Sequence, residues 1–521
     1  MQHGNGISRF LDRCAYVISP SWGASRMATR AQWENFSGVY HDGASKDRLH
    51  NGKWLGSKIS PDSALEGDLE TLRGRSHELY RSDSLGGMVD TMVDHIVGQG
   101  FTCNAKIRPV LGISDEAASG FNASIEALVE QWSKAVCISR IDSWWEIDRL
   151  LCRHLLIDGE AFLVMSSQAD GYGVSPVPLV LEVVDPERVE TPPEKESDNS
   201  CRMGIQYDSR NRIIGYWIRT THPHDTKDVE IKYQYVPKSR CKHLMERWFT
   251  GQSRGYPWMT RVLNDARDGK DIREAGLVAA QVQACLSVWI KGPKPKLNAQ
   301  SRSSDTDTAG RRIQTVEPGS VNYIGESEEP IFLQPSGATG LSDLLTMNDR
   351  RIAAGMNIPY EFIARNWNGV SFAGGRLILN GAKISVGVKQ KLIAIRAKAP
   401  VYHELVRQGV ILGQLDINPS AYNRRPWVYQ RHHWTHPLWS YAITPGEEVR
   451  ALREAVDGNL TTQEAATAQY SGMDSDEVIP QRGKELEAQR KANCLPKDQR
   501  QAEAQATAAE NNQGSKPDGG A

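Results

Sequence analysis

The sequence predicts an α+β protein in which helices and strands occupy different stretches of the chain. Apolar residues recur at steps of three and four between about Asp62 and Val97, as in amphipathic helices. Short apolar or alternating runs bounded by Gly, Pro and Asp occupy residues 161–235, as in strands. Long helical stretches follow from Tyr256 onward.

Composition and charge are those of an ordinary soluble globular protein, with 39% hydrophobic and 24% charged residues. At roughly 150 residues per domain, the length indicates about three or four structural units. The longest uncharged apolar stretch, Ala275–Ile290, falls short of the ~20 residues of a membrane-spanning helix. We therefore expect no membrane association. The net charge of −1 lacks the basic excess of a free DNA-binding domain, so any contact with nucleic acid must be local or weak.

The ends of the chain and its cysteines indicate a cytoplasmic site of synthesis. Residues 1–60 show little periodicity and are interpreted as a loosely ordered arm, and residues 497–521 as a disordered tail. Met1–Ser21 lacks the continuous apolar core of a signal peptide. The eight cysteines are scattered, which fits reduced thiols better than a disulfide framework or a zinc site.

Three helices are predicted in the first part of the chain. The first block, Asp62–Val97, is broken near Ser82–Gly87 and ends at Gly98, as a glycine C-cap would end it. The second helix is predicted over Ser114–Ile138 and the third over Ser143–Ile157.

Strands follow these helices. Ala161–Met165 and Leu179–Val184 are short apolar runs bounded by turn residues. Ile205–Tyr207 and Ile213–Arg219 flank a polar turn and predict a hairpin. Val229–Tyr235 alternates apolar and polar residues and predicts a half-buried strand.

A long helix is predicted over Tyr256–Ile290, followed by a small β excursion and a second helix. Prolines interrupt residues 293–338, where Gly319–Ile324 and Ile331–Leu333 resemble short strands. The second helix is predicted over Ser342–Met356. This order places the excursion at the far end of a helix pair.

Residues 360–373 predict a projecting loop that joins two helices, because they are rich in Trp, Asn and Gly. Pro359 closes the preceding helix, and a third long helix is predicted over Gly374–Gly409. The alternative is a loop buried against a neighbouring molecule, with Trp367 as its anchor.

No catalytic motif is present, so we expect no enzymatic activity, no metal and no cofactor. His432, His433 and His436 lie close together, but no nearby Cys, Asp or Glu completes a metal-binding set, and the surrounding aromatic residues indicate packing. Asp158 and Glu160 flank a glycine before a strand, and we interpret them as part of a turn.

The helix predicted over Gly374–Gly409 is strongly basic, with Glu404 as its only acidic residue. Its basic side chains either form a face that is solvated or paired with a partner, or they contact DNA phosphates without recognising the nucleotide sequence. The charge alone favours the first interpretation. The candidates for phosphate contact are Arg376, Lys383, Lys389 and Lys391.

Several local phrases carry a resemblance. They are Arg73–Phe101 (RGRSHELYRSDSLGGMVDTMVDHIVGQGF), Trp145–Met165 (with GEAF), Gly251–Leu263 (GQSRGYPWMTRVL), Arg351–Phe362 (RIAAGMNIPYEF), Trp439–Val449 and Leu460–Val478. In this order the phrases resemble the lambda-type portal proteins of tailed bacteriophages. One departure is the phrase at Ser371–Arg376, where only the arginine matches the family's Tyr-Ser-Ser-x-Arg.

The resemblance implies a homo-oligomeric ring, usually of twelve subunits, at a capsid vertex of the virion. Double-stranded DNA would be packaged and ejected through it. The implied portal-type subunit has an α/β wing, a two-helix stem, a small β clip, a long wing helix and a helical crown. The corresponding ranges are 1–60 (arm), 61–254 (wing), 255–292 and 339–359 (stem helices), 293–338 (clip), 360–373 (tunnel loop), 374–445 (long helix and wing return), 446–496 (crown) and 497–521 (tail).

The resemblance also implies sites and partners. DNA would pass the channel loop without sequence specificity, and the terminase large subunit, then a head–tail adaptor, would dock on the clip. Major capsid and scaffold proteins are further expected partners. The channel-loop residues are Arg365, Asn366, Trp367, Asn368, Val370, Ser371 and Phe372. The docking residues are Lys294, Lys296, Arg311, Arg312, Glu326, Glu328 and Glu329.

Two alternatives stay open on the sequence. One is a cytoplasmic α/β nucleic-acid-processing enzyme, which would need clustered carboxylates or a phosphate loop. The other is a different head–tail connector or minor capsid protein.

Overall fold

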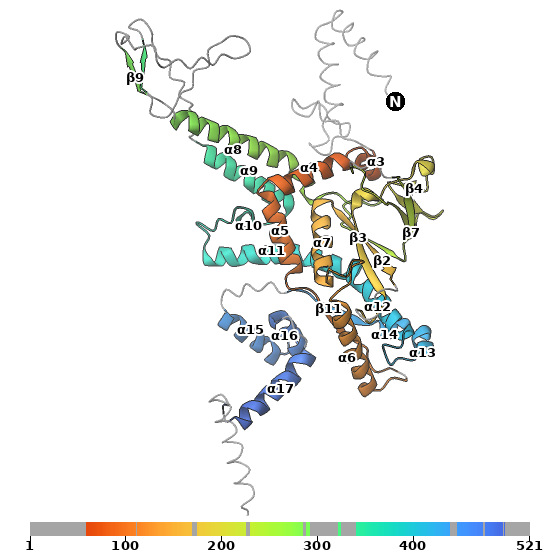
Figure 1. Ribbon diagram of the computed structural model, residues 1–521. Helices are drawn as coiled ribbons and strands as arrows, with labels where there is room; N and C mark the ends of the chain where they lie inside the picture. Colours follow the sequence, from red (N-terminus) through yellow and green to blue (C-terminus); the bar gives the residue numbers. More distant parts are fainter. Residues whose placement is uncertain are drawn as a thin grey trace, which may run out of the picture. The chain divides into compact units, whose positions relative to one another are not determined.

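The structure, a computed structural model, is a mixed α+β fold, as the sequence predicts (Figure 1). The chain divides into two units, Met1–Ser63 and Ala64–Ala521, and all elements below belong to the second, except that α3 (Pro61–Glu66) begins in the first. The residues described are 59–110, 112–168, 175–225, 230–284, 288–291, 321–324, 340–437, 445–471, 475–492 and 494. Most of the predicted N-terminal arm and the predicted tail therefore lie outside them.

The predicted first helical block is two helices, α4 (Leu69–Ser82) and α5 (Leu85–Val97). Gly98 ends α5 at a φ of 48°, a conformation that costs glycine little. The second predicted helix, α6 (Asp115–Trp132), ends six residues early, because the following segment turns back to bond α7 and β3. Helix α7 (Trp144–Ile157) begins at a capping box formed by Ser143 and Glu146.

Strand β2 (Glu160–Ser167) is the centre of the β region and is antiparallel to β3 (Leu179–Val184) on one side and to β8 (Cys241–Met245) on the other. Its side chains alternate between two buried clusters. Ala161, Leu163 and Met165 join the larger cluster with the helices, whereas Phe162 and Val164 join the second cluster. This strand is therefore buried on both faces.

The second cluster is covered by a four-stranded antiparallel sheet. Its strands are β4 (Cys201–Arg202), β5 (Ile205–Tyr207), β6 (Ile213–Arg219) and β7 (Tyr233–Pro237). The hairpin prediction agrees with β5 and β6. Of the strand predicted over Val229–Tyr235, only Tyr233–Tyr235 lie in β7, because β6 ends at Arg219, opposite Tyr233. Residues 230–232 are not in a strand, and Val229 lies outside the described residues.

The prediction of one helix over Tyr256–Ile290 is also wrong at both ends. A 3₁₀ turn, η5 (Trp258–Arg261), precedes α8 (Leu263–Ala284), and the chain then forms strand β9 (Val288–Lys291). Pro257 sets the extended entry to η5. Strand β9 pairs in parallel with β10 (Val321–Ile324), whereas the predicted strand at Ile331–Leu333 lies outside the described residues.

Helices α8 and α9 (Leu341–Met356) lie side by side (Figure 1). Two glycines of α8 allow this close approach. A Cβ at Gly276 would lie 2.5 Å from the Leu341 side chain, and one at Gly269 would lie 2.4 Å from that of Asn348. Among the described residues, no helix is long and apolar enough to cross a membrane.

The predicted loop over 360–373 is partly helical, which corrects the prediction. Helix α10 (Tyr360–Ala364) follows Pro359, and Phe372 is already the first residue of α11 (Phe372–Ile393). Pro359 favours a helix start because its φ is fixed and it needs no donor there. The connection that remains is Arg365–Ser371.

The third long helix continues from α11 through one π turn (Ala394–Lys398) into α12 (Ala399–Ile411). The π turn ends two residues before Pro400, which lacks the N–H that a regular helix would use. Within the turn, Lys398 is buried, forms an ion pair with Asp148 of α7 and lies 3.7 Å from the centroid of the Trp144 ring. The pair ties the long helix to α7.

The rest of the chain carries one strand and five short or medium helices among the described residues. Strand β11 (His432–Thr435) is antiparallel to β1 (Thr102–Ala105). The helices are α13 (Pro419–Arg424), α14 (Pro426–Tyr429), α15 (Pro445–Asp457), α16 (Gln463–Ser471) and α17 (Ser475–Lys491).

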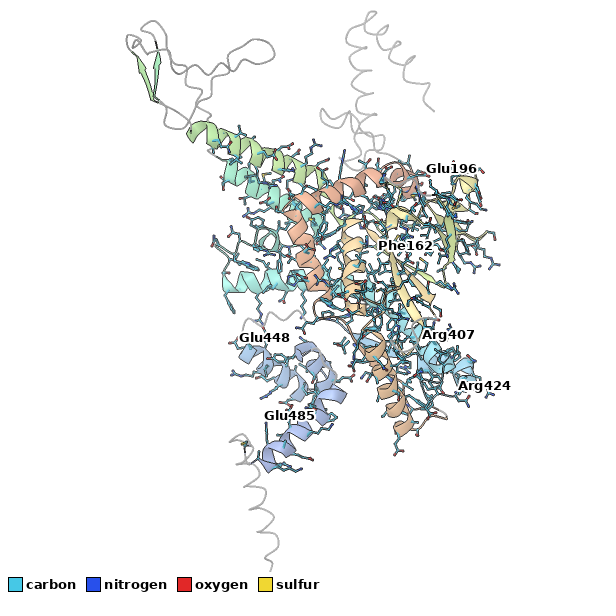
Figure 2. The ribbon with its side chains drawn as sticks, in the orientation of Figure 1. Phe162, Glu196, Arg407, Arg424, Glu448 and Glu485 are labelled. Atoms are coloured by element: carbon cyan, nitrogen blue, oxygen red, sulfur yellow. The ribbon has the colours of Figure 1, made fainter. Side chains whose placement is uncertain are left out.

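Truncating Phe162 tests the second cluster. The Phe162 side chain, labelled in Figure 2, is fully buried. Its ring stacks on that of His243, with 4.3 Å between the ring centroids. We expect Phe162→Ala to lower the free energy of unfolding by about 3–5 kcal/mol, measured by chemical denaturation. Phe249→Ala, at an exposed ring, is the control and should cost less than about 1 kcal/mol. Equal losses for the two variants would contradict the assignment of Phe162 to a packed core.

Candidate functional site

A buried network of ion pairs and hydrogen bonds centres on Glu160, at the start of β2. This side chain is fully buried, yet it is ionised among three donors from distant segments. Arg73 of α4 pairs with Oε1, Arg254 Nε donates to the same oxygen at 2.6 Å, and His243 Nε2 donates to Oε2 at 2.7 Å. Burial alone would raise the pKa of Glu160, but Arg254 and Arg73 hold it well below its usual range.

Arg254 extends the network to the 3₁₀ turn η3 (Pro186–Arg188) and to the turn between β4 and β5. Its Nη1 donates to the carbonyls of Val189 and Met203, and its Nη2 to that of Pro186, each at 2.7 Å. Each of the three guanidinium nitrogens thereby donates at least one hydrogen bond, as a buried guanidinium requires. The amide of Gly255 also donates to Glu160 Oε2 at 2.9 Å.

Asp158 forms a second buried carboxylate site two residues away. His77 Nε2 lies 2.5 Å from its Oδ1, and His154 Nδ1 lies 2.7 Å from its Oδ2. Burial opposes ionisation, but the two histidines lower the pKa of Asp158 to about 2. Between the two carboxylates, Gly159 has a φ of 82° and lies so close to Tyr256 that a Cβ would be 2.1 Å from its backbone.

The chemistry of this arrangement is structural. Glu160 and Asp158 are both buried from solvent, and each of their carboxylate oxygens already has at least one hydrogen-bond partner in this chain. The sequence reasoning placed Glu160 in a turn and missed its role. The signal was an acidic residue at the head of an apolar strand, which must have buried cationic partners.

The three main members of the network come from three of the phrases quoted above. Arg73 lies in the first phrase, Glu160 in the GEAF phrase and Arg254 in the GQSRG phrase. The ion pairs of the network therefore join three phrases that lie far apart in the sequence.

The connection Arg365–Ser371 is exposed but anchored. Arg365 Nη2 donates to Thr91 Oγ1 of α5 at 3.0 Å, and the Trp367 ring meets the Phe362 ring edge-on at 5.9 Å. The Asn366 side chain accepts the amide of Asn368 at 3.0 Å. These contacts give the segment a defined shape.

Ser371 caps α11, because its hydroxyl accepts the amide of Gly374 at 3.1 Å. Phe372 is exposed at the first position of that helix, and Val370 is half-buried. The predicted channel-loop residues are thus contiguous and lead directly into the basic helix.

The four predicted phosphate-contacting bases do not form one uniform face. Lys389 pairs with Glu246 at 3.2 Å and lies over the Trp258 ring, so its charge is already used. Arg376, Lys383 and Lys391 are exposed. The predicted docking residues between Lys294 and Glu329 lie outside the described part of the chain.

Of the three histidines, His432 and His433 lie in strand β11, and His436 directly follows it. The His432 ring lies 4.7 Å from the Tyr402 ring, and the His436 ring meets that of Phe101 edge-on at 5.8 Å. Among the described residues, the group whose ligand atoms are close enough for a metal is instead Asp185, Glu187 and His222.

That group has a simpler explanation than a metal site. Glu187 Oε2 lies 3.0 Å from His222 Nε2, and Asp185 Oδ1 accepts the Glu187 amide at 2.9 Å as a helix cap. An ion pair and a cap account for all three side chains.

Comparison with known proteins identifies one family. The family model described as phage portal protein, lambda family, matches residues 47–389. The probable portal protein of Halomonas phage phiHAP-1 is 23% identical over 466 residues, which cover 84% of this chain and 84% of that protein. Portal protein B of Escherichia phage lambda is 21% identical, and the alignment covers 88% of this chain and 91% of that protein.

A solved structure is similar over much of the chain. It is the neck of an empty gene transfer agent particle computed with C6 symmetry, which matches 77% of this chain and 92% of its own with a TM-score of 0.41 and 10% identity. At this degree of similarity, the family assignment rests on the sequence matches.

Neutralising Glu160 tests the buried network. Glu160→Gln leaves Arg73 and Arg254 buried without a counter-charge, so we expect a loss of about 3–5 kcal/mol in the free energy of unfolding. Chemical denaturation measures it, with the exposed Glu194→Gln as control. A Glu160→Gln protein as stable as the control would show that the carboxylate charge is dispensable.

Acid unfolding tests Asp158. Its pKa is about 2 in the folded protein against 3.8 for an ordinary aspartate. The lowered pKa stabilises the fold above about pH 4, and this contribution of about 2 kcal/mol is lost as the pH falls through 2. Asp158→Asn should therefore be less stable than the unmodified protein at pH 6, and the difference should shrink towards pH 2. A difference that does not vary with pH would contradict the assignment.

Proposed function

Because the chain belongs to the lambda family of phage portal proteins, we propose that it forms a closed ring through which double-stranded DNA enters and leaves the phage head. Portal proteins are structural, non-enzymatic components of the virion, located at the neck of the capsid vertex. The observation that carries the proposal is the family match over residues 47–389, which reaches from the arm to the basic helix.

The order of elements supports a portal-type division of the chain. The unit organised around β2 would be the wing, over 61–254. Helices α8 and α9, which lie side by side, would form the stem over 255–292 and 339–359, with β9 at the end of the first stem range. Strand β10 would lie in the clip over 293–338. The long helix and wing return would be 374–445, and α15 to α17 would be the crown over 446–496.

We infer that the connection Arg365–Ser371, within the tunnel loop 360–373, lies at the narrowest point of the channel. It joins α10 to α11 and exposes Trp367 and Phe372. Its one cation, Arg365, is held by Thr91. Contacts with DNA are therefore mainly steric, which lets the duplex slide, since phosphate contacts by free cations are strong and cumulative.

Large apolar side chains left exposed support assembly into a ring. Leu277 and Val278 of α8, and Leu344 and Met347 of α9, are about half exposed or more. Contiguous exposed apolar side chains mark interaction sites. In a ring of twelve copies, the neighbouring subunits would bury them.

The proposed partners follow from the proposed role. The terminase large subunit would dock on the clip during packaging, and a head–tail adaptor would replace it afterwards. The seven charged residues named above, from Lys294 to Glu329, would face these partners. Major capsid and scaffold proteins would surround the wing during assembly.

The proposal is tested by changing two residues of the connection and measuring both ring assembly and DNA packaging. The double variant Trp367→Gly and Val370→Gly should form closed rings in electron micrographs but package or retain less DNA, because it removes the bulk at the constriction. The double variant Trp427→Gly and Val110→Gly, also at exposed positions, is the control.

Three outcomes would contradict parts of the proposal. Monomers, dimers or open filaments of the unmodified protein under assembly conditions would exclude the ring. Normal packaging and retention by the Trp367 and Val370 variant would exclude this connection as the constriction, and failure to assemble would give it a structural role.

A further inference from the structure

Helix α11 exposes an apolar ridge opposite the face that it buries. Its buried face is Ala382, Val386, Gln390 and Ile393. On the other side, four large apolar side chains are between 56% and 75% exposed. The ridge consists of Leu377, Gly381, Ile384, Val388 and Lys391 of α11, and of Ile395 in the π turn that continues it.

The spacing of the ridge is that of a helix–helix seam. Its positions alternate in steps of four and three, the repeat by which one helix keeps a single line of side chains against another. Lys391 is the polar member, and a single polar residue in such a seam fixes its register. The ridge is therefore patterned for a second helix.

Gly381, on the ridge, supports the same conclusion. A glycine within a helix is disfavoured relative to alanine. At Gly381, a Cβ would meet nothing within 4 Å, so no described part of this chain explains the absent side chain. Space of this kind lets a neighbouring backbone approach closely.

Charge restricts the partner. No acidic residue occurs between Phe372 and Tyr402, and two of the lysines there pair with Glu246 and Asp148 as described above. The remaining bases form no ion pair with any side chain that the structure describes. They are Arg376, Lys383, Lys391 and Arg396. The partner helix should be acidic.

Helix α6 has a complementary face. From Asp115 to Trp132 it has no basic residue, and Asp115, Glu116 and Glu130 form no ion pair with a described side chain. Its exposed line Glu116, Gly120, Ala123, Ala127 and Glu130 also advances in alternating steps of four and three. Between the two glutamates this line holds only Gly and Ala, which leaves a shallow groove that a ridge of larger side chains can fill.

We propose that the α11 ridge of one subunit packs into the α6 groove of the next subunit. This contact rests on the proposed function, the closed ring, and would join each subunit of that ring to the next. Because the two faces differ, the contact is head-to-tail, the type that generates rings when the rotation closes. A DNA-facing role suits the ridge less well, because its centre is apolar and phosphate requires cations.

The ridge is tested with Ile384→Asp combined with Val388→Asp. We expect at least a tenfold loss of rings at concentrations at which the unmodified protein assembles, measured by light scattering after size exclusion. Ile141→Asp, at a side chain 78% exposed outside both helices, should assemble normally. Unchanged circular dichroism spectra and melting temperatures would show that the variants fold.

The pairing of α11 with α6 is tested by charge reversal. One variant carries Arg376→Glu, Lys383→Glu and Lys391→Glu, and the other carries Asp115→Lys, Glu116→Lys and Glu130→Lys. Each variant alone should fail to form rings, because like charges meet at every contact. Mixed in equal amounts, the two should form rings of alternating subunits, since every contact then joins opposite charges.

Several outcomes would overturn the inference. Rings of the Ile384 and Val388 variant would exclude the ridge from the interface. Normal assembly of the α6 variant, or no recovery on mixing, would give the ridge a different occupant. Normal rings that fail to retain DNA would place the ridge against nucleic acid. If the unmodified protein forms no rings, the proposed function fails instead.

Discussion

The buried carboxylate of Glu160 is the constraint on which the rest of the described fold depends. A charge without water is stable only if nearby donors satisfy it, and here the donors come from α4, β8 and the segment that leads into η5 and α8. The ion pairs therefore fix where the first helices, the central sheet and the segment that leads into α8 meet. Removing one partner leaves the others buried without a hydrogen-bond partner, so the ion pairs stabilise the fold only together.

The close approach of the backbones completes this junction. Gly159 and Gly255 face each other, and a Cβ on Gly255 would lie 2.2 Å from the carbonyl oxygen of Gly159. Because the chain enters η5 and α8 directly from Gly255, a shift at the junction would redirect the helix pair that leaves it. In a portal ring, such rigidity would hold the stem at a constant angle to the wing in every subunit.

Local patterns predicted much of the fold, because helices and hairpins depend on nearby residues. The bounds of β3, β5 and β6 follow from apolar runs between turn residues, and the starts of α6 and α7 follow from Ser114 and Ser143 as caps. Strand β8 was missed, because Cys241–Met245 has no alternating pattern of its own and becomes a strand by pairing with β2. The long helix prediction at Tyr256–Ile290 failed for a similar reason, since apolar helical composition continues into a segment that pairs as β9.

The candidate site was less predictable than the fold. The connection Arg365–Ser371 was expected from its turn residues, but the contacts that hold it were not. Thr91, which binds Arg365, is distant in the sequence. Phe362, which contacts Trp367, lies in α10, a helix that the sequence did not indicate. The ion pair between Lys389 and Glu246 could likewise not be predicted, because the two residues are far apart along the chain. Glu160 shows the general difficulty, since its three partners come from positions that no local pattern links to it.

The most direct measurement of the central claim is a cryo-electron-microscopy map of the assembled protein. The account predicts a closed ring in which Arg365–Ser371 lines the smallest radius of the channel, with β2 and the Glu160 ion pairs farther from the axis. A map that shows a closed ring with this connection at the outer rim, or no closed ring, would contradict it.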